Sequence, residues 1–256
     1  MKICILTYLH NSKQWLDIFL DQLFNIDYPK EDLFYLFTES DSEDGTVERL
    51  RERTNSIINK EIFTYSIKNY AYSCHYDKLA FVHDEAFKRV SNLDFEYEYI
   101  FSIDSDVLTI DEKILKTLIN DINSFNDSKL GGIAPMCCRE GSGEPPVFYD
   151  WGGFMINHKN FNFGGHFPYF PGFQFNKIYK IDSMGMCFLI KKEILPLDFF
   201  HPDLGKINGF GAPLIHWAVA FERLKSKFNF YLDSGIRVYH MDPIQRGFIR
   251  TAQNTR

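Results

Sequence analysis

Two kinds of hydrophobic pattern alternate along the first half of the chain. Short apolar runs are typical of buried strands, and they occupy residues 2–8, 33–38, 61–67, 97–103 and 130–136. Between these runs, apolar side chains recur at helical spacing over residues 13–24, 47–53, 77–90 and 114–125. Strands that alternate with helices in this way predict an α/β fold, in which helices flank a mostly parallel central sheet.

The pattern changes after Met136. Residues 137–176 are rich in glycine, proline and aromatic side chains and show no clear periodicity. A long loop of this kind is typically functional or disordered, and its many aromatic residues argue against disorder. Regular patterns return as a strand at 186–190, a helix at 213–227 and a final strand at 237–240. No linker or internal repeat divides the chain, so we predict one domain over residues 1–256.

Composition narrows the classes of function. The chain has 256 residues and a formal net charge of −6, which implies no general affinity for nucleic acid or anionic membranes. Five cysteines without a Cys-x-x-Cys pair indicate reduced thiols and a cytoplasmic setting. No apolar run approaches the roughly 20 residues of a membrane span. The apolar run at residues 1–7 is too short for the core of a signal peptide, and it fits a first strand better.

Two carboxylates lie where the apolar run 97–103 ends. Asp104 and Asp106 are one residue apart, so strand alternation places both side chains on one side. Like charges placed together repel unless a cation lies between them, which favours a divalent metal with a phosphate-bearing substrate. The acidic residues 39–41 end the strand 33–38. Because ligands of parallel sheets bind beyond the carboxyl ends of the strands, both acidic segments are expected to share one site.

Four segments, in order, resemble nucleotide-sugar glycosyltransferases of the GT-A fold. Asp104-Ser105-Asp106 matches the family's Asp-x-Asp motif. Residues 3–8 (Ile-Cys-Ile-Leu-Thr-Tyr) resemble the first strand, and residues 39–46 (Glu-Ser-Asp-Ser-Glu-Asp-Gly-Thr) resemble the acidic loop after the second. Residues 231–240 resemble the C-terminal strand that ends in a metal-binding histidine. The resemblance implies that residues 1–136 bind the nucleotide sugar and that residues 137–256, with the aromatic-rich loop, bind the acceptor.

The resemblance also implies a role for individual residues on the donor side. Asp106 would bind Mn²⁺ or Mg²⁺ directly, and Asp104 would hold the ribose or the water shell of the metal. His240 would add a protein contact to the metal or the diphosphate. The remaining donor-binding residues would be Glu39 at the nucleotide base, Thr7 and Tyr8 in the same pocket, Ser105 within the motif, and Lys78 near the phosphates. The resemblance implies a UDP-sugar as the donor. In such sites a hard cation stabilises the nucleoside diphosphate leaving group.

One position departs from the family pattern. Many inverting members carry Glu-Asp ahead of the C-terminal histidine, and that aspartate is the general base. At the same distance before His240, this chain has Ile215-His216. An imidazole can accept a proton near neutral pH, so His216 is one candidate base. Asp150 and Asp182 are others, and a retaining mechanism needs no such base.

The acceptor is not readable from the sequence. Trp151 is expected to stack on a sugar or base, and Gly185 is expected to permit close approach of the backbone to a ligand. A glycan, a lipid-linked sugar, a protein and a modified DNA base all stay open as acceptors. Two other functions also stay open: a nucleotidyltransferase on a related α/β fold, and a non-catalytic carbohydrate-binding relative.

Overall fold

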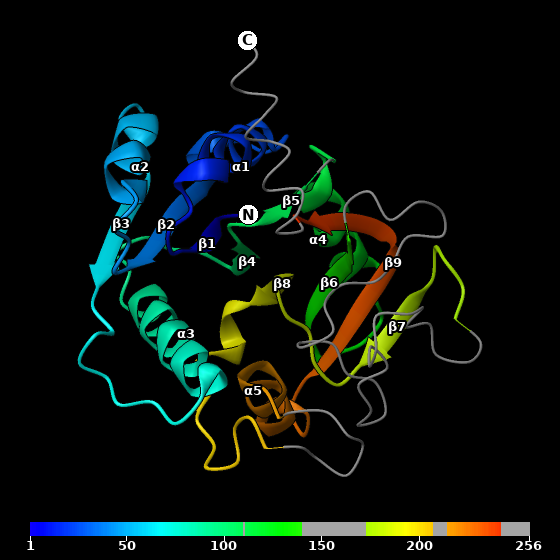
Figure 1. Cartoon of the computed structure of the whole chain (residues 1–256). Helices are drawn as coiled ribbons and strands as arrows, with labels where there is room; N and C mark the ends of the chain where they lie inside the picture. The colour runs from blue at the N-terminus through cyan, green and yellow to red at the C-terminus, as the bar shows by residue number, and fades with distance from the viewer. Residues whose placement is uncertain (110, 140–172, 207–213, 242–256) are drawn as a thin grey trace.

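The computed structural model describes residues 1–109, 111–139, 173–206 and 214–241. This part of the chain forms one nine-stranded sheet with helices on both faces (Figure 1). The strands are β1 (Ile3–Leu9), β2 (Leu33–Ser40), β3 (Lys60–Tyr65), β4 (Tyr99–Asp104), β5 (Val107–Leu108), β6 (Leu130–Arg139), β7 (Ile178–Ile181), β8 (Cys187–Lys191) and β9 (Asn229–His240). The α-helices are α1 (Lys13–Asn25), α2 (Thr46–Thr54), α3 (His75–Ser91), α4 (Ile114–Ser124) and α5 (His216–Leu224), and short 3-10 turns lie at Lys30–Asp32 and Lys192–Ile194.

The sheet is mostly parallel, as the sequence predicts. Its strand order is β3-β2-β1-β4-β8-β6-β9-β5, and β7 pairs with β9. The first four strands in this order are mutually parallel, and β6 is parallel to β9. Only β8, β5 and β7 run against their neighbours in the described sheet. The carboxyl ends of β1, β2 and β4 therefore meet at one edge.

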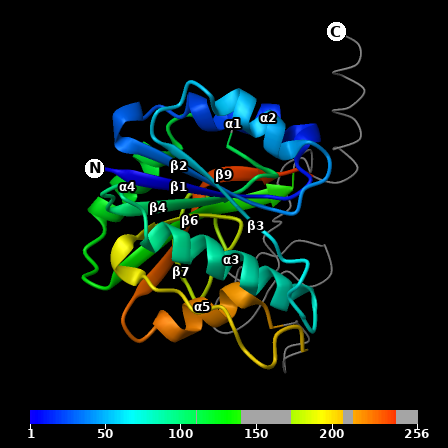
Figure 2. The same cartoon turned by 90° about the vertical axis from the view of Figure 1, so that its left-hand side faces the viewer.

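Both faces of the sheet are covered, which explains why its central strands read as continuous apolar runs. In β1, Ile3 and Ile5 pack into the core that contains Leu16 of α1 and Leu50 of α2. The alternate side chain of Cys4 packs into a second core, under α3 and α5. Figure 2 shows α1 and α2 on one side of the sheet and α3 and α5 on the other. None of the described helices combines the length and hydrophobicity that a membrane span requires.

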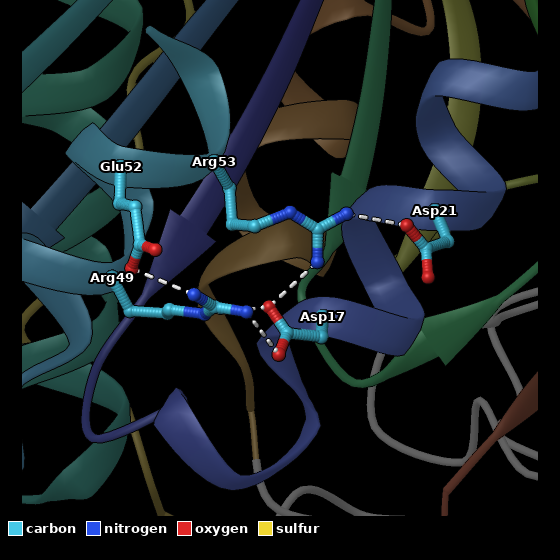
Figure 3. A network of polar contacts seen from close by, with 5 residues as sticks. All are labelled: Asp17, Asp21, Arg49, Glu52 and Arg53. Carbon is cyan, nitrogen blue, oxygen red and sulfur yellow. Dashed lines mark hydrogen bonds and ion pairs between the residues drawn. The ribbon is translucent and has the colours of Figure 1, made fainter.

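An ion-pair network joins α1 to α2 (Figure 3). The Asp17 carboxylate accepts hydrogen bonds from Nε of Arg49 at 2.9 Å and from Nη2 of Arg49 at 2.8 Å. It also accepts one from Nη1 of Arg53 at 2.7 Å, and Arg53 pairs in addition with Asp21. Glu52 accepts from Arg49 at 2.6 Å. The network fixes the spacing of the two helices whose first turns border the carboxyl edge of the sheet.

The hydrophobic pattern misses β5, β7 and the first half of β9, although the resemblance over residues 231–240 covers most of β9. β5 has two residues, which is too short for a periodic signal, and β7 is a half-exposed strand that pairs only with β9 among the described strands. In β9 the register against β6 shifts, so that Asp233 pairs with Pro135 and Arg237 with Met136. Residues 234–236 form the irregularity within one long strand, whereas Asp-Ser-Gly in sequence resembles a turn.

Candidate active site

A cleft of about 280 Å³ opens at the carboxyl ends of β1, β2 and β4, beside the first half of α3. It is lined by Tyr8, Leu9, His10, Ser12, Trp15, Ser40, His75, Lys78, Leu79, Val82, His83, Asp104, Ser105 and Asp106. The sequence predicts that ligands of such a sheet bind at this edge. Of the expected donor-binding residues, the cleft brings together Tyr8, Lys78 and the three residues of the Asp-x-Asp motif.

The short strand β5 brings His240 to Asp106. After Asp104 ends β4, the chain turns through residues 105–106, and Val107 pairs with His240 in β9. The backbone N–H of Met241 donates to the carbonyl of Asp106 at 2.9 Å. As a result, Nε2 of His240 lies 3.3 Å from Oδ2 of Asp106. Two side chains far apart in the sequence are thus in contact, and one of them, Asp106, lines the cleft.

The other residues of the motif are tied to their surroundings. The N–H of Asp104 donates to the carbonyl of Met186 at 2.8 Å, so the segment 182–186 lies directly beside the motif. Gly185, expected near the acceptor, is buried in that segment. The hydroxyls of Ser105 and Ser12 are 3.2 Å apart, which links the motif to the start of α1.

The loop after β2 is organised by its own carboxylates. Oδ2 of Asp44 accepts from the N–H of Lys13, and Oδ1 accepts from the N–H of Thr46, both at 3.0 Å. One carboxylate therefore caps the first residues of α1 and α2 together. Burial raises the pKa of Asp44, but the hydrogen bonds from Thr46 and Lys13 outweigh it and leave the pKa below its ordinary value. Glu39 is buried and accepts from the N–H of Ser42 at 2.6 Å.

Thr7 and Tyr8 lie at different depths. Thr7 is fully buried in β1, and its side chain does not line the cleft. Tyr8 lines the cleft with its ring, while its hydroxyl is 3.0 Å from Oγ of Ser102 in the sheet. Burial raises the pKa of Tyr8 well above its usual range, so this phenol stays protonated. Tyr8 thus offers the cleft an aromatic surface.

Several cleft residues had no individual role predicted from the sequence, His10 and Ser40 among them, although Ser40 belongs to the segment 39–41 that was expected at the site. Nδ1 of His10 donates to the carbonyl of Ser40 at 2.6 Å, and Nε2 accepts from the amide of Asn11 at 3.3 Å. These contacts tie the ends of β1 and β2 together. A usable signal was present, because both residues directly follow predicted strands at the edge where ligands bind.

His216, the first residue of α5, lies behind the cleft against His83 of α3. The two imidazoles are stacked, with centroids 4.6 Å apart and planes 25° apart. Burial lowers the pKa of His83 to about 4. Burial also lowers the pKa of His216 well below its usual range, with a smaller electrostatic contribution from His83 and His75. Neither nitrogen of His216, nor Nε2 of His83, has a hydrogen-bond partner among the described residues. Each such buried nitrogen costs about 1–3 kcal/mol unless a ligand or water satisfies it.

The two other candidate bases are placed unequally. Asp182 is half-buried, at the end of β7 in the segment that leads to Met186. Asp150 and the expected acceptor residue Trp151 lie outside the described residues.

Asp106 and His240 fit a divalent metal as a two-donor set. Within the described ranges, no three His, Cys, Asp or Glu side chains cluster as a metal site. The contact between the carboxylate and the imidazole nevertheless gives one oxygen and one nitrogen donor next to each other, and Asp106 lines the cleft. Mn²⁺ accepts such a mixed set, and the oxygens of a bound diphosphate would complete its shell.

Comparison with solved structures shows what this fold is. The chain is similar to the crystal structure of S. aureus TarS 1–349, with a TM-score of 0.57 and 12% identity over 97% of this chain and 63% of the other. The TarS complex with UDP-GlcNAc gives 0.56 and 13% identity over 94% and 59%. The mannosyltransferase PcManGT from Pyrobaculum calidifontis, in complex with GDP-Man and Mn²⁺, gives 0.53 and 12% identity over 94% and 56%.

The similarity has clear bounds. The chain spans less than two thirds of the length of each of these three chains. No protein-family model and no curated protein matches the sequence. At these identities the shared property is the arrangement of the sheet and its helices, and on that ground the chain has a glycosyltransferase fold.

Proposed function

We propose that this protein is a metal-dependent glycosyltransferase that moves a sugar from a nucleotide-sugar donor to an acceptor. The contact between Asp106 and His240 carries the proposal, because it supplies a metal-binding pair at the edge of the sheet where nucleotides bind. Lys78 lines the same cleft, and no carboxylate in the described ranges forms an ion pair with it. Solved structures of the same fold hold UDP-GlcNAc, or GDP-Man with Mn²⁺.

The residues of the cleft divide the work of binding the donor. Asp106 and His240 would hold Mn²⁺ or Mg²⁺, which when bound neutralises the charge that develops on the diphosphate leaving group. Lys78, from α3, adds a positive charge to the lining of the cleft. Tyr8 offers its ring to the nucleotide, and Asp104 is held in place by Met186 for contact with the ribose or the metal's water. A UDP-sugar is the donor we propose, with Glu39 on the side of the base.

The general base is chosen among His216, Asp182 and Asp150. The low pKa of His216 keeps its imidazole neutral and able to accept a proton, but it also makes the imidazole a weak base. Asp182 adjoins the segment that is bonded to Asp104. A rate that falls at least about 100-fold on His216→Gln or Asp182→Asn would identify the base. An unchanged rate in both directs the search to Asp150 or to a retaining mechanism.

The acceptor side is proposed in outline. Gly185 lies beside the Asp-x-Asp motif, and we place the acceptor over this segment and over Trp151. A glycan, a lipid-linked sugar, a protein or a modified DNA base can occupy it. We propose a cytoplasmic location, because none of the five cysteines forms a disulfide.

A thermal-shift panel tests the proposal. UDP, GDP, UDP-GlcNAc and GDP-Man are each added with Mn²⁺, with Mg²⁺ and with EDTA. A ligand present at 100 times its Kd stabilises the folded state by about 2.7 kcal/mol, which is about 5–10 °C in Tm for a chain of this size. We expect such a shift for at least one nucleotide sugar, and only with a metal ion. Release of a nucleoside diphosphate, and not of pyrophosphate, separates sugar transfer from nucleotidyl transfer.

The variant Asp106→Asn sharpens the test. It removes the metal-binding charge but keeps the shape of the side chain, so the metal-dependent shift should disappear while the fold persists. The matched control is Asp94→Asn, an exposed carboxylate ahead of β4 at the opposite edge of the sheet, which should behave as wild type. Full metal-dependent binding and turnover in Asp106→Asn would refute the metal assignment.

A further inference from the structure

The ring of His83 has a fixed tautomer. Its Nδ1 is 2.8 Å from the carbonyl oxygen of Leu79, one helical turn earlier in α3. A carbonyl oxygen can only accept a hydrogen bond, so Nδ1 carries the proton. The other nitrogen, Nε2, is then a hydrogen-bond acceptor. It is buried, and no group in the described part of the chain donates to it.

The surroundings of His83 are aromatic and poor in donors. Its ring centroid lies 4.3 Å from that of Tyr8, 4.6 Å from that of His216 and 4.4 Å from that of Trp217. Both nitrogens of His216 also lack a partner among the described residues. Three unsatisfied nitrogens therefore gather in one place. Because buried polar groups almost always have partners, this grouping indicates a ligand that supplies them.

The chemistry of the pair selects the kind of ligand. His83 is 5% exposed and lines the same cleft as Asp104 and Asp106. A phosphate or carboxylate group has no proton to give to Nε2 of His83, so an anion does not satisfy this nitrogen. A transition metal does not fit between the two imidazoles, because their nitrogen lone pairs lie in stacked ring planes only 25° apart and do not converge on one ion. A hydroxyl group fits, since it donates to Nε2 while the carbon atoms next to it contact the aromatic rings.

We propose that His83, backed by His216, forms a hydroxyl-binding subsite that holds a sugar ring in the cleft and determines which sugar is accepted. This subsite rests on the proposed function, and it is the part of the cleft that would distinguish one sugar from another. The low pKa of His83 supports it, because Nε2 keeps its lone pair at neutral pH. The ring that supplies the hydroxyl belongs either to the donor or to a sugar acceptor.

Calorimetric binding in the presence of Mn²⁺ tests the donor. His83→Phe keeps an aromatic ring against Tyr8 and Trp217 but removes Nε2. We expect it to weaken the binding of UDP-GlcNAc or GDP-Man about 3- to 10-fold and to leave UDP and GDP unchanged. His83→Gln places an amide oxygen near the position of Nε2 and should restore part of the affinity. The control is His201→Phe, a histidine whose side chain is 38% exposed and does not line the cleft.

A second arm tests a sugar acceptor. With UDP and Mn²⁺ bound, glucose, galactose, mannose and GlcNAc are added, and their contact with the protein is detected by saturation-transfer NMR. Loss of the signal in His83→Phe assigns the hydroxyl to the acceptor. The subsite is overturned if both arms give wild-type values in His83→Phe, or if UDP and GDP weaken as much as the nucleotide sugars.

The outcomes separate the subsite from the function on which it rests. Wild-type protein that binds neither nucleotides nor nucleotide sugars overturns the proposed function and the subsite together. Wild-type binding that His83→Phe leaves intact overturns the subsite alone. If His83→Phe does not fold, ¹⁵N-labelled histidine in wild-type protein gives the answer. The Nε2 resonance should shift when UDP-GlcNAc, GDP-Man or a monosaccharide is added, and a resonance that none of these shifts overturns the subsite.

Discussion

The carboxylate of Asp44 should stabilise two helices at once. It accepts from the N–H groups of Lys13 in α1 and Thr46 in α2, and the hydroxyl of Thr46 also donates to it. Loss of one helix cap costs about 0.5–2 kcal/mol, typically about 1 kcal/mol. Asp44→Ala removes two caps and is therefore expected to lower the free energy of unfolding by about 2 kcal/mol. For a chain of this size, that corresponds to about 4–8 °C in Tm.

The same carboxylate gives the effect a pH dependence. The pKa of Asp44 is lower in the folded protein than its ordinary value, because the hydrogen bonds to the charged form outweigh burial. Its stabilisation is therefore present above the unfolded-state pKa of about 3.9, and it is lost as the pH falls through the lower folded-state pKa. Chemical unfolding of wild type and Asp44→Ala at pH 7 should differ by the full amount, and the difference should decrease as the pH falls below the unfolded-state pKa of about 3.9.

Two variants control the measurement. Glu43→Ala removes the neighbouring acidic residue, whose side chain is 77% exposed and pairs with Lys68, and it should change stability by less than about 0.5 kcal/mol. Asp44→Asn keeps one oxygen acceptor and should fall between wild type and alanine. An Asp44→Ala protein as stable as wild type at pH 7, or a deficit that is the same at pH 3 and pH 7, would refute the double cap.

Two further predictions concern the frame of the cleft. A Cβ on Gly132 would lie 2.6 Å from Cγ2 of Ile190 and 2.7 Å from the carbonyl oxygen of Leu189, so Gly132→Ala should destabilise the chain by about 2–3 kcal/mol in urea unfolding. Unchanged stability would show that β6 and β8 can separate freely. Asp17→Ala removes the half-exposed centre of the α1–α2 network and should cost about 1 kcal/mol at low salt and less in 1 M NaCl. A loss that salt does not reduce would contradict an ionic origin.

The alternation of strands and helices is what the sequence shows best. The run 2–8 predicts β1 because all its central residues are buried between two cores, which leaves an unbroken apolar signal. The same apolar signal locates the end of the strand 97–103, so the carboxylates of Asp104 and Asp106 are predicted at the edge of the sheet. Both line the cleft at that edge.

What the sequence hides depends on contacts between distant segments. No local pattern marks β5, whose two residues matter only because they pair with β9. His83 occupies the buried face of α3 with Ala80, Phe87 and Val90, so its position reads as core. Its role emerges only when Leu79 fixes its tautomer and Tyr8 and His216 close around it. The sequence signal for His83 is its position as a polar residue on the otherwise apolar, buried face of α3.

The pairing of β5 with β9 has a consequence for when the contact between Asp106 and His240 can form during synthesis. A nascent chain that has emerged as far as β6 already contains β1 to β4 and both aspartates of the motif, yet it lacks His240 and the segment that binds the N–H of Asp104. The contact between Asp106 and His240 therefore requires β8 next to β4 and β9 next to β5, and both of these strands come late in the chain. A chain that ends before β9 therefore lacks the Asp106–His240 pair on which the proposed function rests.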